Sequence, residues 1–180
     1  MSGDEGRDQA RTGGDTGELE APTPEPAGVL IIGYGNPLRG DDGIGWLAAG
    51  LLAEDPRLRG ARVLARHQLT PELAADLADA SLVILVDVNV TADPGVVSVR
   101  GLDGSRRSSP ASTHHADPGD LAALARELYG AAPAVFVVSV GAASLDLGEG
   151  LSAPVEKALP AVVEAVVELV ACHAGPGQAG

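Results

Sequence analysis

Residues 29–43 read Val-Leu-Ile-Ile-Gly-Tyr-Gly-Asn-Pro-Leu-Arg-Gly-Asp-Asp-Gly, and this stretch decides how the chain folds. Its branched apolar run predicts a buried strand. A Gly-x-Gly-Asn turn follows, and two adjacent carboxylates, Asp41 and Asp42, then open a predicted helix. This order is typical of an open α/β sheet, which holds its functional residues at the carboxyl ends of its strands. Asp41 and Asp42 are therefore the first candidate site residues.

The composition of the chain limits its class and its partners. With residues 1–27 set aside, about 150 residues remain, which is enough for one domain with a single core. The formal net charge of -13 disfavours nucleic acid and anionic membranes as partners, because both need clustered Lys and Arg. Cys172 is the only cysteine, so no internal disulfide forms, and neither a leader peptide nor a membrane-length apolar run is evident. We therefore expect a cytoplasmic protein without a membrane partner. A monomer is expected as well, although the sequence does not disclose the oligomeric state.

The apolar pattern divides the chain into a tail, a domain and a short end. Residues 1–27 carry almost no large apolar side chain, which predicts a disordered acidic tail. The domain is expected over 28–173, followed by a flexible C-terminus over 174–180. The pattern predicts strands at 28–34, 61–66, 81–87, 95–100 and 133–140, helices at 42–54, 70–79, 117–129 and 153–173, and a loop at 102–116.

Two predicted strands are apolar on both faces, at 82–86 and 134–138. Such strands indicate a mostly parallel sheet that is covered by helices on each side. The predicted fold class is α/β, a three-layer αβα sandwich. In the last helix, Pro160 predicts that the main helix begins there after a short turn, since proline is tolerated in a first turn but not in a helix interior.

The turn after the first strand partly resembles a dinucleotide-binding motif. The third glycine of Gly-x-Gly-x-x-Gly is replaced by Leu38, and Pro37 removes an N–H that a pyrophosphate would use. No carboxylate ends the second strand, where Ala65-Arg66-His67 stands instead. The turn therefore disfavours a nucleotide site, although a nucleotide-dependent enzyme remains one alternative.

One of the two adjacent aspartates has a structural explanation. Aspartate is a preferred N-cap, and the helix dipole favours negative charge in the first turn. A cap needs only one of Asp41 and Asp42, so the other is free for a site. Nearby glycines, Gly40, Gly43 and Gly45, permit close approach by another backbone or by a ligand.

Asp87 ends the apolar strand at 81–87, where a buried charge is costly unless it is paired. His114 and His115 precede a helix that Asp117 is expected to cap, with Pro118 in its first turn. Imidazole beside carboxylates makes a ligand set suited to a first-row transition metal. His67 also ends a strand, so its side chain is a further candidate for the same edge of the sheet.

A nucleophilic mechanism has no support in the sequence. Cys172 falls in the terminal apolar helix, and Gly-x-Ser-x-Gly is absent. The serines between 105 and 112 fall in the loop at 102–116, away from any strand-turn-helix elbow. The pattern therefore disfavours covalent catalysis.

The run Gly33-x-Gly35-Asn36-x-Leu38-x-x-Asp41-Asp42-Gly43-x-Gly45 resembles the opening motif of the nickel-iron hydrogenase maturation proteases. The resemblance extends over about residues 28–171. Other segments match the family in order and approximate spacing: Asp87 after its strand, Ser112-Thr113-His114-His115, Val138-Ser139-Val140-Gly141, and Leu147-Gly148-Glu149-Gly150-Leu151-Ser152. The segment at 67–73, His-Gln-Leu-Thr-Pro-Glu-Leu, resembles one branch of the family.

This resemblance implies an endopeptidase that removes a C-terminal extension from a hydrogenase large-subunit precursor after nickel insertion. It also implies that an acidic residue, a strand-end aspartate and a histidine contact nickel, which the precursor carries. By position these fall on Asp42, Asp87 and His114. Some family members have glutamate where Asp42 stands, so the Asp42 side chain is shorter than theirs by one methylene. His115 remains an alternative to His114.

Two mechanisms and one non-enzymatic role remain open at this stage. Nickel can act as a Lewis acid on the scissile carbonyl or on a bound water. Alternatively, Asp42 and Asp87 share a proton as an aspartic pair, which requires one raised pKa. A non-catalytic maturation factor would use the same three residues to hold a metal or the precursor.

Overall fold

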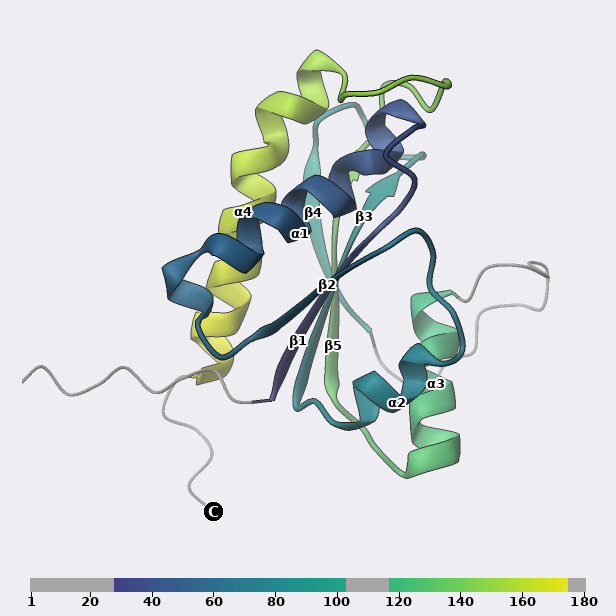
Figure 1. Ribbon diagram of the computed structural model, residues 1–180, viewed down its shortest axis with the longest axis vertical. Helices are drawn as coiled ribbons and strands as arrows, with labels where there is room; N and C mark the ends of the chain where they lie inside the picture. Colours follow the sequence, from purple (N-terminus) through teal and green to yellow (C-terminus); the bar gives the residue numbers. More distant parts are fainter. Residues whose placement is uncertain (1–27, 103–116, 175–180) are drawn as a thin grey trace, which may run out of the picture.

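The computed structural model describes residues 28–102 and 117–174, and these form one five-stranded sheet with helices on both faces (Figure 1). The order of the strands is β2-β1-β3-β5-β4, in which β4 alone runs antiparallel to its neighbour. The strands span Val29–Tyr34 (β1), Arg62–Arg66 (β2), Leu82–Asn89 (β3), Val97–Leu102 (β4) and Ala134–Gly141 (β5). The mostly parallel sheet that the sequence predicts is confirmed.

The side chains on the two faces of the sheet pack into two separate hydrophobic cores. On β3, Ile84 and Val86 pack in one core while Val83 and Leu85 pack in the other, because successive strand residues point to opposite faces. All four side chains have no exposed surface. Burial on both faces explains why this strand reads as a continuous apolar run.

Two pairs of helices cover the two cores, as Figure 1 shows. Helices α1 (Ile44–Glu54) and α4 (Ala153–Ala174) cover one face of the sheet. Helices α2 (Leu73–Ala78) and α3 (Pro118–Tyr129) cover the other. The αβα sandwich is therefore confirmed.

Some element boundaries differ from those predicted. The first helix begins as a separate 3-10 turn, η1 (Gly40–Gly43), and α2 begins three residues later than expected, after turn hydrogen bonds at Thr70 and Pro71. Strand β3 continues past Asp87 to Asn89, because β5 is long enough to pair with these residues. The predicted tail, the loop at 102–116 beyond residue 102, and the end after residue 174 lie outside the described residues.

The prediction that the last helix begins at Pro160 is wrong, because α4 runs without a break from Ala153 to Ala174. Pro160 is exposed, whereas Val155 before it and Val162 after it are fully buried against the sheet. Burial on both sides of the proline offsets the lost hydrogen bond and the ring clash, which together cost about 3 kcal/mol.

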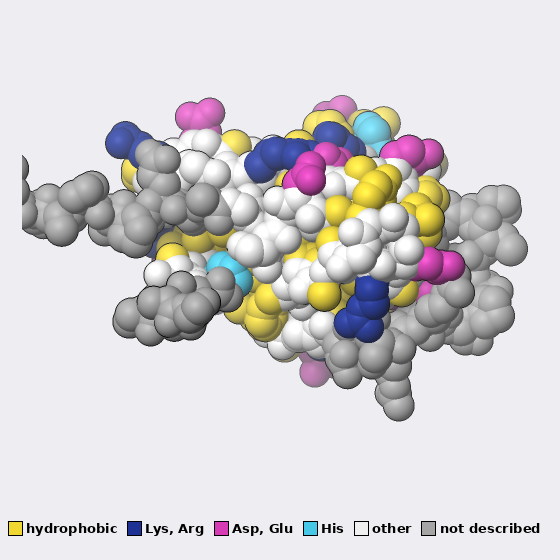
Figure 2. Space-filling model, turned by 90° about the horizontal axis from the view of Figure 1, so that it is seen from below, with side chains coloured by type: hydrophobic (Ala, Val, Ile, Leu, Met, Phe, Trp, Pro, Cys, Tyr) yellow, Lys and Arg dark blue, Asp and Glu magenta, His cyan; other side chains and the backbone are white. Residues whose placement is uncertain are grey.

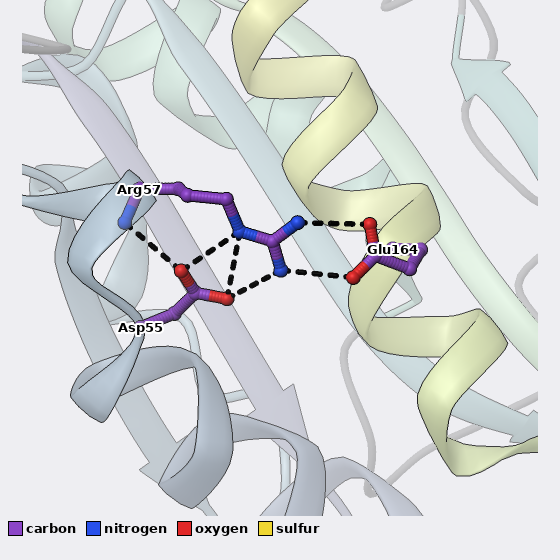
Figure 3. Close-up of polar contacts among 3 residues, drawn as sticks. All are labelled: Asp55, Arg57 and Glu164. Atoms are coloured by element: carbon purple, nitrogen blue, oxygen red, sulfur yellow. Dashed lines mark hydrogen bonds and ion pairs between the residues drawn. The ribbon is translucent and has the colours of Figure 1, made fainter.

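An exposed ion-pair cluster joins the end of α1 to α4 (Figure 3). The Arg57 guanidinium, in the turn η2 (Pro56–Leu58), donates to Asp55 at 2.6 Å and to both carboxylate oxygens of Glu164 at 2.9 Å. Because the Arg57 and Glu164 side chains face solvent, the cluster orients the helix ends more than it stabilises the fold.

Within residues 28–102 and 117–174, no helix is both long enough and apolar enough to span a membrane. On the face that Figure 2 shows, acidic and basic side chains stand close together among apolar and uncharged ones. Among the described residues of that face, no continuous basic surface forms.

Candidate functional site

Asp42 and Asp87 come from two neighbouring strands of the sheet, at their carboxyl ends. Asp42 follows β1 in η1, and Asp87 lies in β3, which pairs directly with β1. The chain goes from β1 to β2 on one side and returns to β3 on the other, so the β1–β3 pair is the topological switch point of the sheet. Open α/β sheets bind ligands in the crevice at this point.

Both carboxylates line one open pocket of about 490 Å³. Each is held by a backbone amide: Asn36 N donates to Asp42 Oδ2 at 2.8 Å, and Val88 N donates to Asp87 Oδ1 at 2.7 Å. The pocket is lined by Tyr34, Gly35, Asn36, Arg39, Asp42, His67, Gln68, Leu69, Asp87, Val88, Val90 and Leu145.

Two glycines allow η1 and α1 to pack on the end of β1. Gly35 has φ 131°, and a Cβ there would collide with the carbonyl of Asp42. A Cβ on Gly45 would collide with the backbone of Tyr34 and of Val86. The close approach that these glycines permit is therefore made by backbone, and it sets Asp42 beside β3.

The backbone amides of the turn are already used within the protein. Gly35 N donates to Arg66 O at 3.1 Å, and Leu38 N to Asn36 Oδ1 at 3.0 Å. The amides of residues 39–42 likewise all donate to protein oxygens. Since Pro37 has no N–H, residues 35–42 offer no spare amide to a pyrophosphate, which argues against the nucleotide alternative.

The expectation that one aspartate caps the helix is wrong, since neither α1 nor η1 has a side-chain cap at its N-terminus. Asp41 is instead fully buried and accepts hydrogen bonds from Ala143, Ser144 and Ser152. Burial by itself raises the pKa of Asp41, but these hydrogen bonds outweigh burial and hold the pKa below its usual value. Asp41 therefore has a structural role, and Asp42 faces the pocket.

Burial raises the pKa of Asp87 from its ordinary value to about 6, and the negative charge of Asp42 adds to this rise. Hydrogen bonds from Tyr34 and from the Val88 amide act in the opposite direction. Because both carboxylates line the same pocket, a single ligand there can contact both. Near neutral pH, Asp87 therefore exchanges readily between its two protonation states.

Tyr34 is a pocket residue that sequence reasoning missed. It is the last residue of β1, and its ring packs against the core below α2 and α3. Burial, followed by the charge of Asp87, raises the pKa of Tyr34, so its hydroxyl stays protonated in the pocket that Asp87 also lines. Two positions before Tyr34, Ile32 faces the same core, so strand alternation was the available signal.

His67 lies at the same pocket, as its position after β2 predicts. Its ring contacts that of Trp46 in a tilted arrangement, with the ring centroids 4.9 Å apart and the planes at 37°. Trp46 Nε1 donates to Arg66 O at 2.8 Å. The indole thus fixes the imidazole at the edge of the pocket.

His114 and His115 lie outside the described residues. The helix that follows them is as predicted: Asp117 caps α3 by accepting from Gly119 N at 2.7 Å, and Pro118 stands in its first turn. Over the described ranges, 28–102 and 117–174, no group of three or more His, Cys, Asp or Glu side chains is arranged to hold a metal ion.

Solved structures with the same fold provide the comparison with known proteins. The hydrogenase maturating endopeptidase HybD from E. coli matches with a TM-score of 0.64 and 22% identity, over 81% of this chain and 93% of that one. The NiFe hydrogenase maturation protease HybD from Thermococcus kodakarensis matches with a TM-score of 0.63 and 26% identity, over 79% and 98%.

A third structure, the NiFe hydrogenase maturation protease HycI from Thermococcus kodakarensis KOD1, matches with a TM-score of 0.65 and 22% identity, over 79% of this chain and 92% of that one. No family model matches the chain. No curated protein sequence matches it either. The chain therefore has the fold of the nickel-iron hydrogenase maturation proteases, as the resemblance of its motifs predicts.

Proposed function

We propose that this chain is an endopeptidase that removes the C-terminal extension of a nickel-iron hydrogenase large-subunit precursor after nickel insertion. One observation carries the proposal: Asp42 and Asp87 line a single pocket at the switch point of the sheet. The fold shared with proteins named as maturation proteases supports the same function.

In this proposal Asp42, Asp87 and His114 contact the nickel that the precursor brings. Two carboxylates and an imidazole form a donor set that suits a first-row transition metal. The negative charge of Asp117, three residues after His114, contributes to the raised pKa of Tyr34, so the start of α3 acts electrostatically on the pocket. The histidine itself is chosen from the motif resemblance, which puts it just before α3.

The protein's own groups orient the site. The amides of Asn36 and Val88 fix one oxygen each of Asp42 and Asp87. The other oxygen of each carboxylate is then left to contact the nickel that the precursor brings. Nickel supplies Lewis-acid polarisation of the scissile carbonyl or of the bound water.

The pH dependence of cleavage separates this mechanism from a shared-proton aspartic pair. A metal-contacting Asp87 must be ionised, so the cleavage rate should rise as pH increases through about 6. An aspartic pair needs one of the two carboxyl groups protonated, so its rate would fall over the same range. We expect a rise.

The decisive experiment is mass spectrometry of a hydrogenase large-subunit precursor that is co-expressed with the chain. We expect the wild-type chain to shorten the nickel-loaded precursor and to leave the nickel-free precursor intact. Asp42→Asn, Asp87→Asn and His114→Ala should each abolish shortening. Asp79→Asn, at an exposed position after α2, is the matched control and should cleave like wild type.

Each other result contradicts a defined part of the proposal. Equal cleavage of nickel-loaded and nickel-free precursor would exclude recognition of the metal. A fully active His114→Ala variant would move the third ligand to His115. A stable complex with the precursor that is never shortened would exclude the peptidase and favour a non-catalytic maturation factor.

A further inference from the structure

The segment at 142–152, between β5 and α4, is connected to η1 by hydrogen bonds to the Asp41 carboxylate. Asp41 Oδ2 accepts from Ala143 N at 2.7 Å, from Ser144 N at 2.9 Å and from Ser152 Oγ at 2.9 Å. Asp41 Oδ1 accepts from Ser152 N at 2.7 Å. Hydrogen bonds to a buried carboxylate are among the stronger ones in proteins, so both ends of the segment are held at one point.

The middle of the segment makes its own backbone hydrogen bonds to residues 38–41. Gly40 N donates to Gly148 O, and Gly148 N donates to Leu38 O, each at 3.0 Å. Asp41 N also donates to Ser144 O at 3.1 Å. The segment therefore has a fixed position beside the turn that carries Asp42, although it belongs to no helix or strand.

This fixed segment presents apolar side chains around the pocket. Leu145 lines the pocket together with Asp42 and Asp87. Leu147 is 88% exposed, and Leu38, bonded through its carbonyl to Gly148, is 56% exposed. Exposed leucines on an ordered segment next to a pocket can gain binding free energy when a ligand covers their apolar surface.

We propose that Asp41 is a positioning residue, which holds the 142–152 segment so that Leu145 and Leu147 dock the polypeptide substrate beside the catalytic carboxylates. This inference rests on the proposed peptidase function and names its substrate surface. The occupant is the precursor chain next to the scissile bond, because a polypeptide held by Leu145 is already in the pocket of Asp42 and Asp87. Leu147 is exposed two residues further along the same fixed segment.

The first test measures amide hydrogen exchange by NMR in the full chain without substrate. In Asp41→Asn, the amide protons of Ala143, Ser144 and Ser152 should exchange at least about tenfold faster. Both carboxylate oxygens of aspartate accept hydrogen bonds, whereas asparagine accepts only at its amide oxygen. Ser152→Ala removes only the hydroxyl bond and should give a smaller increase at the same amides. Asp79→Asn is the control and should change none of them.

The second test measures the kinetics of precursor cleavage for two exposed leucines. Leu147→Ser should raise KM about tenfold and leave kcat within about twofold, because it removes apolar contact without touching the carboxylates. Leu128→Ser, at a 62% exposed position on α3, is the matched control and should leave both constants unchanged. Asp41→Asn should raise KM in the same direction as Leu147→Ser.

The outcomes separate this inference from the function on which it rests. Unchanged amide exchange in both Asp41→Asn and Ser152→Ala would overturn the positioning role, whether or not the precursor is cut. An unchanged KM in Leu147→Ser, with wild-type cleavage intact, would overturn the docking surface alone. Failure of the wild-type chain to shorten the precursor would overturn the peptidase proposal and the substrate surface together.

Discussion

The buried carboxylate of Asp41 accepts hydrogen bonds from both the backbone and the side chain of Ser152, 111 residues further along the chain. Its neighbour Asp42 faces the candidate site pocket. Two identical adjacent residues thus divide two tasks, since one joins distant segments and the other is available to a ligand.

Replacing Asp41 should destabilise the protein much more than replacing Asp42. Asp41→Ala removes a fully buried acceptor from three backbone amides and one hydroxyl, so we expect the free energy of unfolding to fall by about 3 kcal/mol. Asp42→Ala removes one hydrogen bond from a backbone amide and should lower the free energy of unfolding by about 1 kcal/mol. Urea denaturation measures both, and equal losses would contradict the division of roles.

Asp87→Asn should stabilise the folded protein at pH 8 but not at pH 4. The pKa of Asp87 is raised in the folded state to about 6, so ionisation disfavours folding as pH rises from the unfolded pKa through 6. The neutral amide avoids this penalty, which we expect to be about 2 kcal/mol above pH 6. Urea denaturation with EDTA present, at pH 4, 6 and 8, tests the trend, and a pH-independent difference would contradict it.

Two glycines of α1 should respond in opposite ways to the same substitution. Gly45→Ala places a methyl group against the backbone of β1 and β3, so we expect a loss of several kcal/mol or failure to fold. Gly50→Ala meets nothing within 4 Å and should stabilise the helix by up to about 1 kcal/mol. Thermal unfolding of the two variants compares them directly, and similar melting temperatures would show that α1 does not pack on β1 so closely.

Pro160→Ala should stabilise α4, because alanine restores the missing hydrogen bond within a helix that is already continuous. We expect a gain of about 1–2 kcal/mol, which is less than the full proline penalty because proline also restricts the unfolded chain. Lys157→Ala, at another exposed position of α4, is the control and should change stability by less than about 0.5 kcal/mol. A loss of stability in Pro160→Ala would indicate that the proline orders the first turns of the helix.

Most of the fold follows from apolar periodicity. Strands β1 and β3 are buried on both faces, so their sequences carry an uninterrupted apolar signal, and the capped start of α3 at Asp117 is equally local. Predictions from local sequence were wrong where packing between segments far apart in the chain determines the structure. Pro160 lies inside a helix because Val155 and Val162 are buried on the sheet at either side of it.

The residues of the candidate site also fall into two groups, those that the sequence indicates and those that only the structure identifies. The sequence places Asp87 and His67 at strand ends, and the motif resemblance selects Asp42; all three line one pocket. Tyr34 was missed because its role depends on the burial of its ring beside Asp87, a contact between two strands. The role of Asp41 depends on its pairing with the segment that begins at Ala143, which no local pattern encodes.

By itself, the sequence determined the order of strands and helices, the three layers and the residues at the carboxyl edge of the sheet, because each depends on a repeat of apolar residues or on a turn within a few positions. Only the tertiary structure decided which of the two adjacent aspartates is buried and which faces the pocket. That choice depends on hydrogen bonds between segments more than a hundred residues apart, and such bonds form only after the sheet has brought the segments together.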